Sequence, residues 1–329
     1  MLLIEKLKSI DILRRTVKSV KIWREYLIDA HQFSKFYMEK CDQHEDFEYR
    51  MLMFVHNLEK GMCMPNPRPF GKEKVNQLMR MIESCEKNKR HVDSSAYKMS
   101  ISILNQWVKF YKDHNWDENL YKTVEDFVAK YSDKEKSLSV GYEILSKEKL
   151  ILDKNASFDD VLRTRRAVRS FTADRLDKDT VQECVALAQA APTACNRQMI
   201  EIIHVEDRKL CDLITNTIYG SSGFSRDTVN YFVITYDIKS LDYYGERNQG
   251  YLNAGLVAMN FVNALHSRGI GSCFIQWANT ESETRTVCQA LKISANKKIA
   301  VVIGAGYYTE EELIAKSCRR STNEIFRRM

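Results

Sequence analysis

The spacing of apolar residues and the glycine content change near residue 150. This change limits the folds that the chain can adopt more than any other feature. Only three glycines, at positions 61, 71 and 141, occur in residues 1–150. Apolar side chains recur there at three- and four-residue spacing, which is the period of an amphipathic helix. The first half therefore predicts an all-helical domain, a bundle with short connections. The expected helices cover residues 4–40, 46–60, 72–89, 94–114 and 119–132.

From about residue 155 the pattern alternates between helix and strand. Such alternation predicts a mixed sheet layered with helices, so the whole chain is expected to be α+β, with a second domain over residues 155–329. The expected strands are 201–205, 229–237, 271–277 and 299–307, and the expected helices are 177–190, 246–268 and 281–291. No GxGxxG or Walker A sequence accompanies them, which argues against a classical dinucleotide fold or a P-loop.

Composition excludes several classes of protein. Hydrophobic residues make up 44% of the 329 residues and charged residues 29%, which is typical of a globular chain. No apolar run approaches the roughly 18–20 residues of a membrane span. The net charge of +6 is modest and mixed in sign, so nucleic acid is not an expected partner.

Cysteine usage and the N-terminus indicate the compartment. Nine cysteines lie scattered from Cys41 to Cys318, without CxxC pairs or metal-ligand spacing. We therefore expect free thiols in a reducing cytoplasm and no metal site. The N-terminal stretch lacks a signal-peptide core because charges interrupt it from Glu5 onward.

The stretch RTRRAVRSF, residues 163–171, concentrates four arginines in seven residues. It follows a capping box that begins at Ser157 and opens a short helix. If the chain is extended after that helix, Arg165, Ala167 and Arg169 share one face. The planar fork of a guanidinium matches two oxygens of a phosphate, so this face suits a planar, anionic ligand. A solvated basic turn is the alternative interpretation.

The stretch GMCMPNPRPFG, residues 61–71, holds three of the four prolines. Gly61 is the expected C′ residue of the preceding helix. His56 and Lys60 stand four residues apart and share a face of that helix. One hypothesis is a rigid loop that brings these two side chains and Arg68 to a ligand site. The other is a structural connector, with Lys60 stabilising the helix C-terminus.

Four separated segments of the second half fit one pattern. They are RTRRAVRSF, AAPTACNRQM at 190–199, NAGLVAMNFVNALHSRGIGSCFIQW at 253–277, and CRRSTNEIF at 318–326. In this order and spacing they resemble the FMN-dependent nitroreductase superfamily. The family shows an RR-S-x-R-x-F opening, a P-S-x-x-N-x-Q loop, a long central helix ending in G-x-G-S, and a late R-K-P. The resemblance covers residues 157–329 and leaves the helical first half as an N-terminal extension.

The resemblance implies FMN as cofactor, NAD(P)H as reductant, and a homodimer with FMN at its interface. It assigns the FMN phosphate to Arg165 and to Arg319, or to Arg320 if the register slips by one. It places Arg169 beside flavin N1 and O2, where a fixed cation favours reduction. The other positions that match flavin-contacting residues are Arg166, Ala167, Pro192, Thr193, Ala194, Asn196, Phe274, Gln276 and Trp277.

The family pattern also assigns roles to loops. The loop that contains Pro192 and Asn196 would approach the flavin from the partner subunit. Loops 216–228 and 239–249 would form a substrate lid, in which Tyr219, Phe224, Tyr243 and Tyr244 either stack on a flat substrate or pack ordinarily. Ala167 departs from the usual hydroxyl residue and Ser321 from the proline of R-K-P, which puts substrate class in more doubt than cofactor. Cys195 is expected to be a small buried side chain, with a redox role in the flavin loop as the alternative. His204 and His266 are expected to be packing or surface residues.

The function that follows is an FMN-dependent oxidoreductase that works by a ping-pong hydride transfer to a small organic acceptor. No side chain is expected to act as acid or base, because the flavin carries the chemistry. A specialised redox step on a biosynthetic intermediate is the alternative within the enzyme class. The alternative outside it is a flavin-fold protein that mainly binds a partner through the bundle.

Overall fold

Helices dominate the first half of the chain, as predicted. The computed structural model describes residues 2–38, 44–131, 138–153 and 155–329, so the expected helix ends at 39–40 and 132 lie outside it. The helices are α1 (Leu2–Met38), α2 (His44–Met62), α3 (Lys72–Asn88), α4 (Ser95–Asp113) and α5 (Glu118–Ala129). Helices α2 to α5 pack around one apolar core, with Leu58, Leu78 and Trp107 fully buried.

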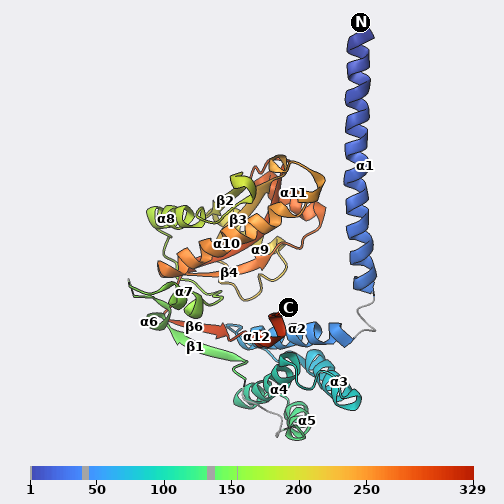
Figure 1. Ribbon diagram of the computed structural model, residues 1–329. Helices are drawn as coiled ribbons and strands as arrows, with labels where there is room; N and C mark the ends of the chain where they lie inside the picture. Colours follow the sequence, from blue (N-terminus) through green and yellow to red (C-terminus); the bar gives the residue numbers. More distant parts are fainter. Residues whose placement is uncertain (1, 39–43, 132–137, 154) are drawn as a thin grey trace.

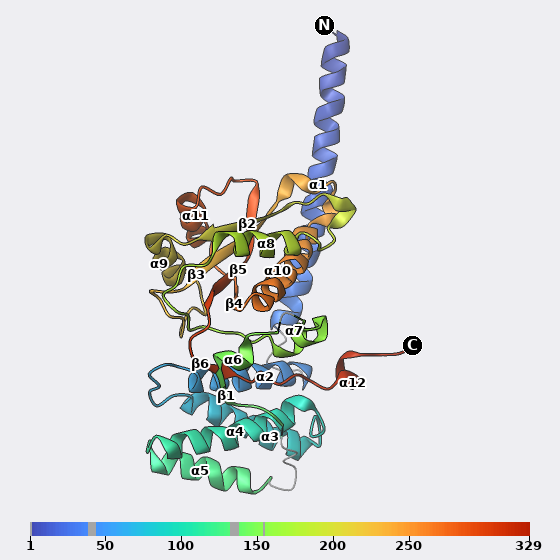
Figure 2. The same cartoon turned by 90° about the vertical axis from the view of Figure 1, so that its left-hand side faces the viewer.

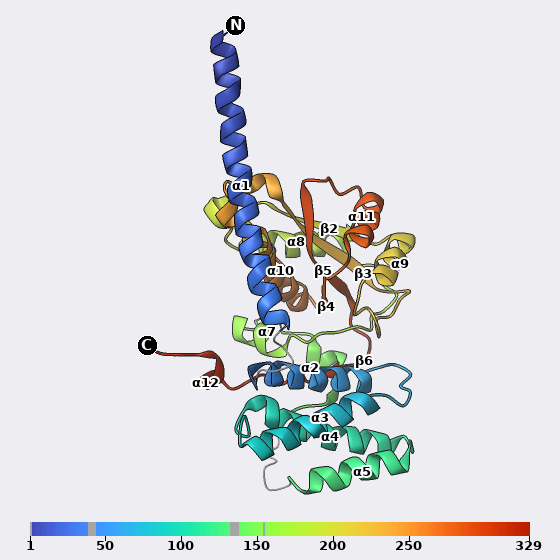
Figure 3. The ribbon, with the colours of Figure 1, turned by 90° about the vertical axis from the view of Figure 1, so that its right-hand side faces the viewer.

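Helix α1 does not join that bundle, which corrects the prediction of one helical unit over residues 1–150. In Figures 1 and 3 it lies along the C-terminal half and continues beyond it. Asp29 and Glu25 of α1 bind Arg247, at 2.5 and 4.0 Å. The apolar side chains of α1 remain exposed because little else packs on the helix. They include Leu13, Val20, Trp23, Leu27 and Phe33.

The second half is built on a four-stranded sheet with the order β2-β3-β5-β4, in which all neighbouring strands are antiparallel. The strands are β2 (Ile200–Val205), β3 (Asn230–Asp237), β4 (Ile270–Gln276) and β5 (Lys297–Tyr307). Side chains alternate between its faces: Tyr231 and Val233 pack on one, Phe232 and Ile234 on the other. Helices α8 (Lys178–Ala188) and α10 (Gln249–Ser267) cover one face, and α9 (Arg208–Thr217) and α11 (Glu281–Ala290) cover the other.

A parallel bridge makes this sheet mixed, as predicted. The capping box of Ser157 and Asp160 is present and starts α7 (Phe158–Thr164). The chain then runs extended along β4: Ala167 forms a parallel bridge with Ser272, and the Val168 N–H donates to the Ser272 carbonyl at 3.0 Å. This pairing places the arginine-rich stretch beside β4.

A second, two-stranded sheet connects the two halves. It pairs β1 (Tyr142–Ser146) with β6 (Glu311–Ala315), and α6 (Lys147–Leu150) follows β1. No strand was expected at β1, which lies inside the half predicted to be helical. After β6 the chain returns across the bundle to α12 (Thr322–Ile325), as Figure 2 shows. Glu324 accepts a hydrogen bond from the Ser95 N–H at 3.1 Å and holds this end on α4.

Glu59 of α2 ties this junction together. Its carboxylate is 1% exposed and accepts the N–H groups of Gly141 and Ser317, at 3.0 and 3.2 Å. One buried side chain thus binds the segments before β1 and after β6. Because buried N–H groups need partners, the position of residues 317–319 depends on this carboxylate.

The proline-rich stretch is irregular, as predicted, but Gly61 does not end its helix. Helix α2 continues to Met62. A Cβ at Gly61 would lie 2.2 Å from the ring of Phe70, so glycine is needed there for close approach. Phe70 fixes the far end of the loop, since its N–H and carbonyl both bind the Tyr111 hydroxyl at 2.7 Å.

Candidate functional site

Four cations from three separate segments gather beside β4. Arg165 lies near Arg319. Burial, with a contribution from the charge of Arg319, lowers the pKa of Arg165. Burial and the proximity of Arg169 lower the pKa of Lys60. Arg165, Arg169 and Lys60 all act on the thiol of Cys273 in β4, whose pKa burial raises. We call Lys60, Arg165, Arg169 and Arg319 the cation cluster.

Members of the cluster have no carboxylate partner among the residues that the structure describes. Within residues 2–38, 44–131, 138–153 and 155–329, Arg165 donates only to the carbonyl of Arg166, at 3.4 Å, and Arg319 only to the carbonyl of Ser317. The Nε of Arg169 is buried, and no atom of these ranges forms a hydrogen bond with it. Positive groups that are partly buried and unpaired are costly, and an anion bound among them removes that cost. The cluster therefore has the chemistry of an anion-binding site.

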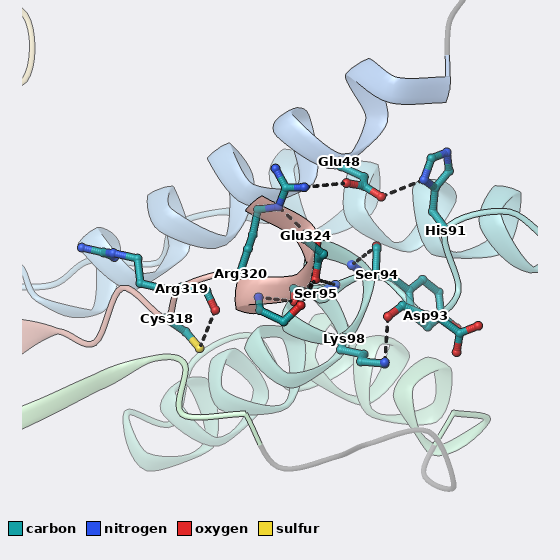
Figure 4. A network of polar contacts seen from close by, with 12 residues as sticks. Glu48, His91, Asp93, Ser94, Ser95, Lys98, Cys318, Arg319, Arg320 and Glu324 are labelled. Atoms are coloured by element: carbon teal, nitrogen blue, oxygen red, sulfur yellow. Dashed lines mark hydrogen bonds and ion pairs between the residues drawn. The ribbon is translucent and has the colours of Figure 1, made fainter. Parts of the chain in front are cut away.

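Neighbouring arginines contrast with the cluster because they are already paired. Arg320 binds Glu324 at 3.1 Å and Glu48 at 3.8 Å, whereas Arg319 points away from both in Figure 4. Arg166, predicted to contact a cofactor, instead lies 3.4 Å from Glu143 and donates to the Arg163 carbonyl at 2.7 Å. Of the two candidates for a second phosphate ligand, the geometry favours Arg319.

Two of the three side chains expected at the end of β4 lie together on its exposed side. Phe274 and Gln276 are exposed, while Cys273 and Ile275 are buried. Trp277 turns toward α11, where its indole N–H donates to the Thr284 hydroxyl at 3.1 Å. Phe274 and Gln276 thus line the open side of the strand, and Trp277 is held by the helix behind it.

The loop of Pro192, Thr193, Ala194 and Asn196 contains the 3-10 helix η3 (Ala194–Asn196). Within the described chain no hydrogen bond or ion pair joins this loop to the cation cluster. Cys195 is exposed and has a φ of 51°, so the expectation of a buried side chain is wrong there.

An ion pair fixes that loop against the neighbouring one. Arg197 binds Glu246 through two bonds of 2.8 and 2.7 Å and donates to the Ser240 carbonyl at 2.7 Å. The hydrogen bonds from Arg197 lower the pKa of Glu246 to about 2. The pair therefore persists across the neutral range and couples the loop after α8 to residues 240–246.

The aromatic residues expected in the lid loops divide into two groups. Tyr219, Tyr243 and Tyr244 are exposed, and the last belongs to the 3-10 helix η5 (Tyr244–Glu246). Phe224 instead is 7% exposed and lies in the core, 6.0 Å below the guanidinium of Arg169. Phe224 therefore packs in the core against Arg169 of the cation cluster and does not form part of a lid.

Of the three residues expected near the proline-rich loop, the structure brings only Lys60 to the cluster. His56 is half exposed and lies 3.9 Å from Glu59. Arg68 is exposed. The start of the loop does reach the C-terminal half: a Cβ at Gly223 would lie 3.3 Å from Met64 Sδ and 3.8 Å from Arg169 Cδ.

His266 forms a buried network that sequence reasoning missed. Its Nδ1 lies 2.8 Å from the Tyr308 hydroxyl and its Nε2 lies 2.8 Å from Thr164. The Thr164 hydroxyl donates to the Asp160 carbonyl, so it accepts from Nε2, and Nδ1 accepts from Tyr308. Burial, together with Arg165, lowers the pKa of His266 to about 4. This neutral imidazole holds the end of α7 beside Arg165 without adding charge, and only its position on an apolar helix face was visible in the sequence.

The buried carboxyl group of Glu312, near Tyr308, predicts how the stability of the protein depends on pH. It is 1% exposed, and burial raises its pKa to about 7 although Thr309 donates two hydrogen bonds to it. A raised acid pKa gives stability that is complete below the unfolded value of about 4.5 and is lost as pH rises toward 7. We expect the free energy of unfolding of the wild type to fall by about 1–3 kcal/mol between pH 5 and 8 relative to Glu312→Gln. Urea titrations at both pH values measure this, and parallel curves would contradict it.

Other features of the described residues do not compete with this site. A cavity of about 710 Å³ lies between α6 and the end of α10, lined by Lys147, Asp153 and Arg268, and contains none of the cation cluster. The described residues contain no group of His, Cys, Asp or Glu able to hold a metal ion. They also contain no helix long and apolar enough to cross a membrane. Cys41 lies outside the described residues, and the other eight cysteines are free thiols.

The fold and the cluster define an α+β protein with a group of cations beside β4, the edge strand of its main sheet. The family model described as "Nitroreductase family" matches residues 162–221 and 231–307. The C-terminal half of the chain thus matches the nitroreductase family model, in agreement with the resemblance that the sequence motifs indicated.

Solved structures of that family are similar to the same half. A nitroreductase family protein from Streptococcus pneumoniae is 23% identical, with 53% of this chain and 100% of that chain covered and a TM-score of 0.44. A putative nitroreductase in complex with FMN from Desulfovibrio desulfuricans is 17% identical, covering 53% and 98%, with a TM-score of 0.44. A family protein from Clostridium novyi is 22% identical, covering 47% and 87%, with a TM-score of 0.43. No curated protein matches the chain.

Proposed function

We propose that the protein binds FMN and transfers hydride from NAD(P)H to a small organic acceptor in a ping-pong reaction. The observation that carries this proposal is the cation cluster beside β4, which lacks a carboxylate partner among the described residues. FMN carries negative charge at its phosphate and, when reduced, on its ring, so it suits a row of separated cations. Bound there, FMN supplies the hydride-accepting atom.

Each group of residues has a proposed task toward FMN. Arg165 and Arg319, which lie near each other, bind the phosphate. Arg169 holds the pyrimidine edge of the ring, which matches its buried, unpartnered Nε. Phe274 and Gln276 lie along the ring from the exposed side of β4. Tyr243 and Tyr244 are proposed to contact the acceptor, and Trp277 and Ala167 to shape the backbone around the ring.

A homodimer completes this site. The loop of Pro192 to Asn196 makes no hydrogen bond to the cluster in its own described chain, so the proposal assigns it to the flavin of the partner. Support comes from α10, whose apolar side chains Leu252, Leu256 and Met259 are exposed on one side. An exposed apolar helix face of this kind is typical of an interface between subunits. The eight free thiols support a cytoplasmic location.

Reconstitution with FMN tests the proposal. We expect the purified full-length chain to carry a yellow chromophore with an absorbance band near about 450 nm, as oxidised flavins do. Anaerobic addition of NADH and of NADPH should bleach this band, and a panel of nitro and quinone acceptors should restore it. A protein that stays colourless after incubation with FMN and fails to oxidise either nicotinamide would contradict the proposal.

Helix α1 favours a second candidate function. Its exposed apolar side chains offer a surface for another protein, which agrees with the hypothesis of a flavin-fold protein that mainly binds a partner. A chain that binds FMN but turns over no acceptor, and that sediments as a complex through α1, would move this function ahead. Turnover by a variant lacking residues 2–38 at the wild-type rate would show that α1 has no part in catalysis.

A further inference from the structure

Lys60 is the member of the cation cluster to which the nitroreductase motifs of the sequence assign no role. It lies on α2, outside the residues 162–307 that the family model spans. Its ammonium group has no hydrogen bond or ion pair within the described part of the chain, although the side chain is half buried. A lysine in that state is expected to serve a ligand or to turn into solvent, and the surroundings of Lys60 decide between the two.

Those surroundings hold Lys60 against the C-terminal half. The loop that follows Lys60 reaches Gly223. A Cβ at Gly223 would contact the side chains of both Met64 and Arg169. Cys63, three residues after Lys60, is also close enough to Arg169 for the guanidinium to act on its thiol. At the other end of the loop, Phe70 is fixed to Tyr111 in the bundle core. The loop is thus anchored on both sides, and Lys60 is held near Arg169.

The carboxylate of Glu59 does not neutralise the charges of Lys60 and Arg169. Glu59 precedes Lys60 in α2, but its buried carboxylate already accepts the N–H groups of Gly141 and Ser317. Besides the thiol of Cys273, the groups that act on the pKa of Lys60 are Arg169 and Lys74, which are both cations. Two cations held close together in a partly buried place repel each other, so they favour a shared anion.

We propose that Lys60 and Arg169 form one anion-binding site at the junction of the two halves. The inference rests on the proposed function, because it places this site beside the flavin ring. The anion is a delocalised negative charge, which either the reduced flavin ring or a carboxylate on the acceptor substrate provides. The helical extension thereby supplies a specificity residue to the active site of the other half.

Lys60→Met removes the charge and keeps the length of the side chain. Lys60→Arg keeps the charge, and Lys72→Met makes the same change of charge at an exposed position just beyond the loop. All three are studied as full-length, FMN-loaded protein. Circular dichroism and FMN content, measured first, confirm that each variant is folded and loaded.

Two measurements distinguish the sources of the anion. If the ring provides it, Lys60→Met destabilises the reduced form about tenfold, which lowers the midpoint potential by about 30 mV for a two-electron couple. If the substrate provides it, the KM for 4-nitrobenzoate rises about tenfold while the KM for neutral 4-nitrobenzamide and both kcat values stay within twofold. Lys60→Arg should restore most of either effect.

The inference is overturned if loaded Lys60→Met matches Lys72→Met in both the potential and the ratio of the two KM values. That outcome leaves the proposed function intact. A wild-type chain that takes up no FMN would instead contradict the proposed function, before any Lys60 variant is compared.

Discussion

Arg165→Ala and Arg319→Ala are each expected to lose most of their FMN during purification. A charge-assisted hydrogen bond to phosphate contributes roughly 1.5–3 kcal/mol, so its loss raises the dissociation constant for FMN roughly 10- to 150-fold. Arg165 is the more buried of the two, and its replacement also relieves repulsion with Arg319, so the effect of the double variant should be less than additive. The ratio of flavin to protein absorbance and titration with FMN measure the loss.

Arg320→Ala is the matched control. It removes a guanidinium one residue away, but one that already binds Glu48 and Glu324. We expect it to retain FMN and to lose a little stability where the chain end crosses α4. Full FMN content in both Arg165→Ala and Arg319→Ala would refute the phosphate assignment, and loss in Arg320→Ala alone would move it by one residue.

Glu59→Ala is expected to be the most destabilising single substitution at the junction. It leaves the N–H groups of Gly141 and Ser317 buried without their acceptor, at a cost of roughly 1–3 kcal/mol each. Because Ser317 stands two residues before Arg319, the variant should also bind FMN more weakly. Urea unfolding and FMN titration of the same sample measure both effects.

Glu59→Gln is the control because its carbonyl oxygen still accepts hydrogen bonds. It should recover more than half of the stability that alanine loses. Equal loss in both variants would show that the negative charge matters and not the acceptor, and wild-type stability in Glu59→Ala would remove Glu59 from the junction.

Local sequence signals predicted much of the fold. Helices α2 to α4 begin and end within two residues of their expected bounds, because apolar spacing and caps act over one or two turns. Helix α5 begins one residue early and ends at Ala129, three residues before its expected end. The capping box at Ser157 is present for the same reason. Alternation of buried side chains likewise located β2 to β5 to within two residues.

Contacts between distant segments were beyond such signals. The spacing of α1 does not reveal that it leaves the bundle, nor does any local pattern place Lys60 beside Arg169. Gly61 was expected to end a helix, yet its role follows from the ring of Phe70, nine positions further along the chain. The family motifs supplied Arg165 and Arg319, but the pairing of Arg166 with Glu143 depends on a strand that was not expected.

The pairing of β1 with β6 also sets an order of events during synthesis. Lys147 and Glu310, whose backbones hydrogen-bond beside the two strands, are 163 residues apart in the sequence. At the usual pace of a ribosome, β1 leaves the exit tunnel on the order of ten seconds before its partner exists. During that interval β1 is an unpaired edge, open to other chains. The helical extension is thus translated first and yet closed last, so a nascent chain needs protection at β1 until the catalytic half has been made.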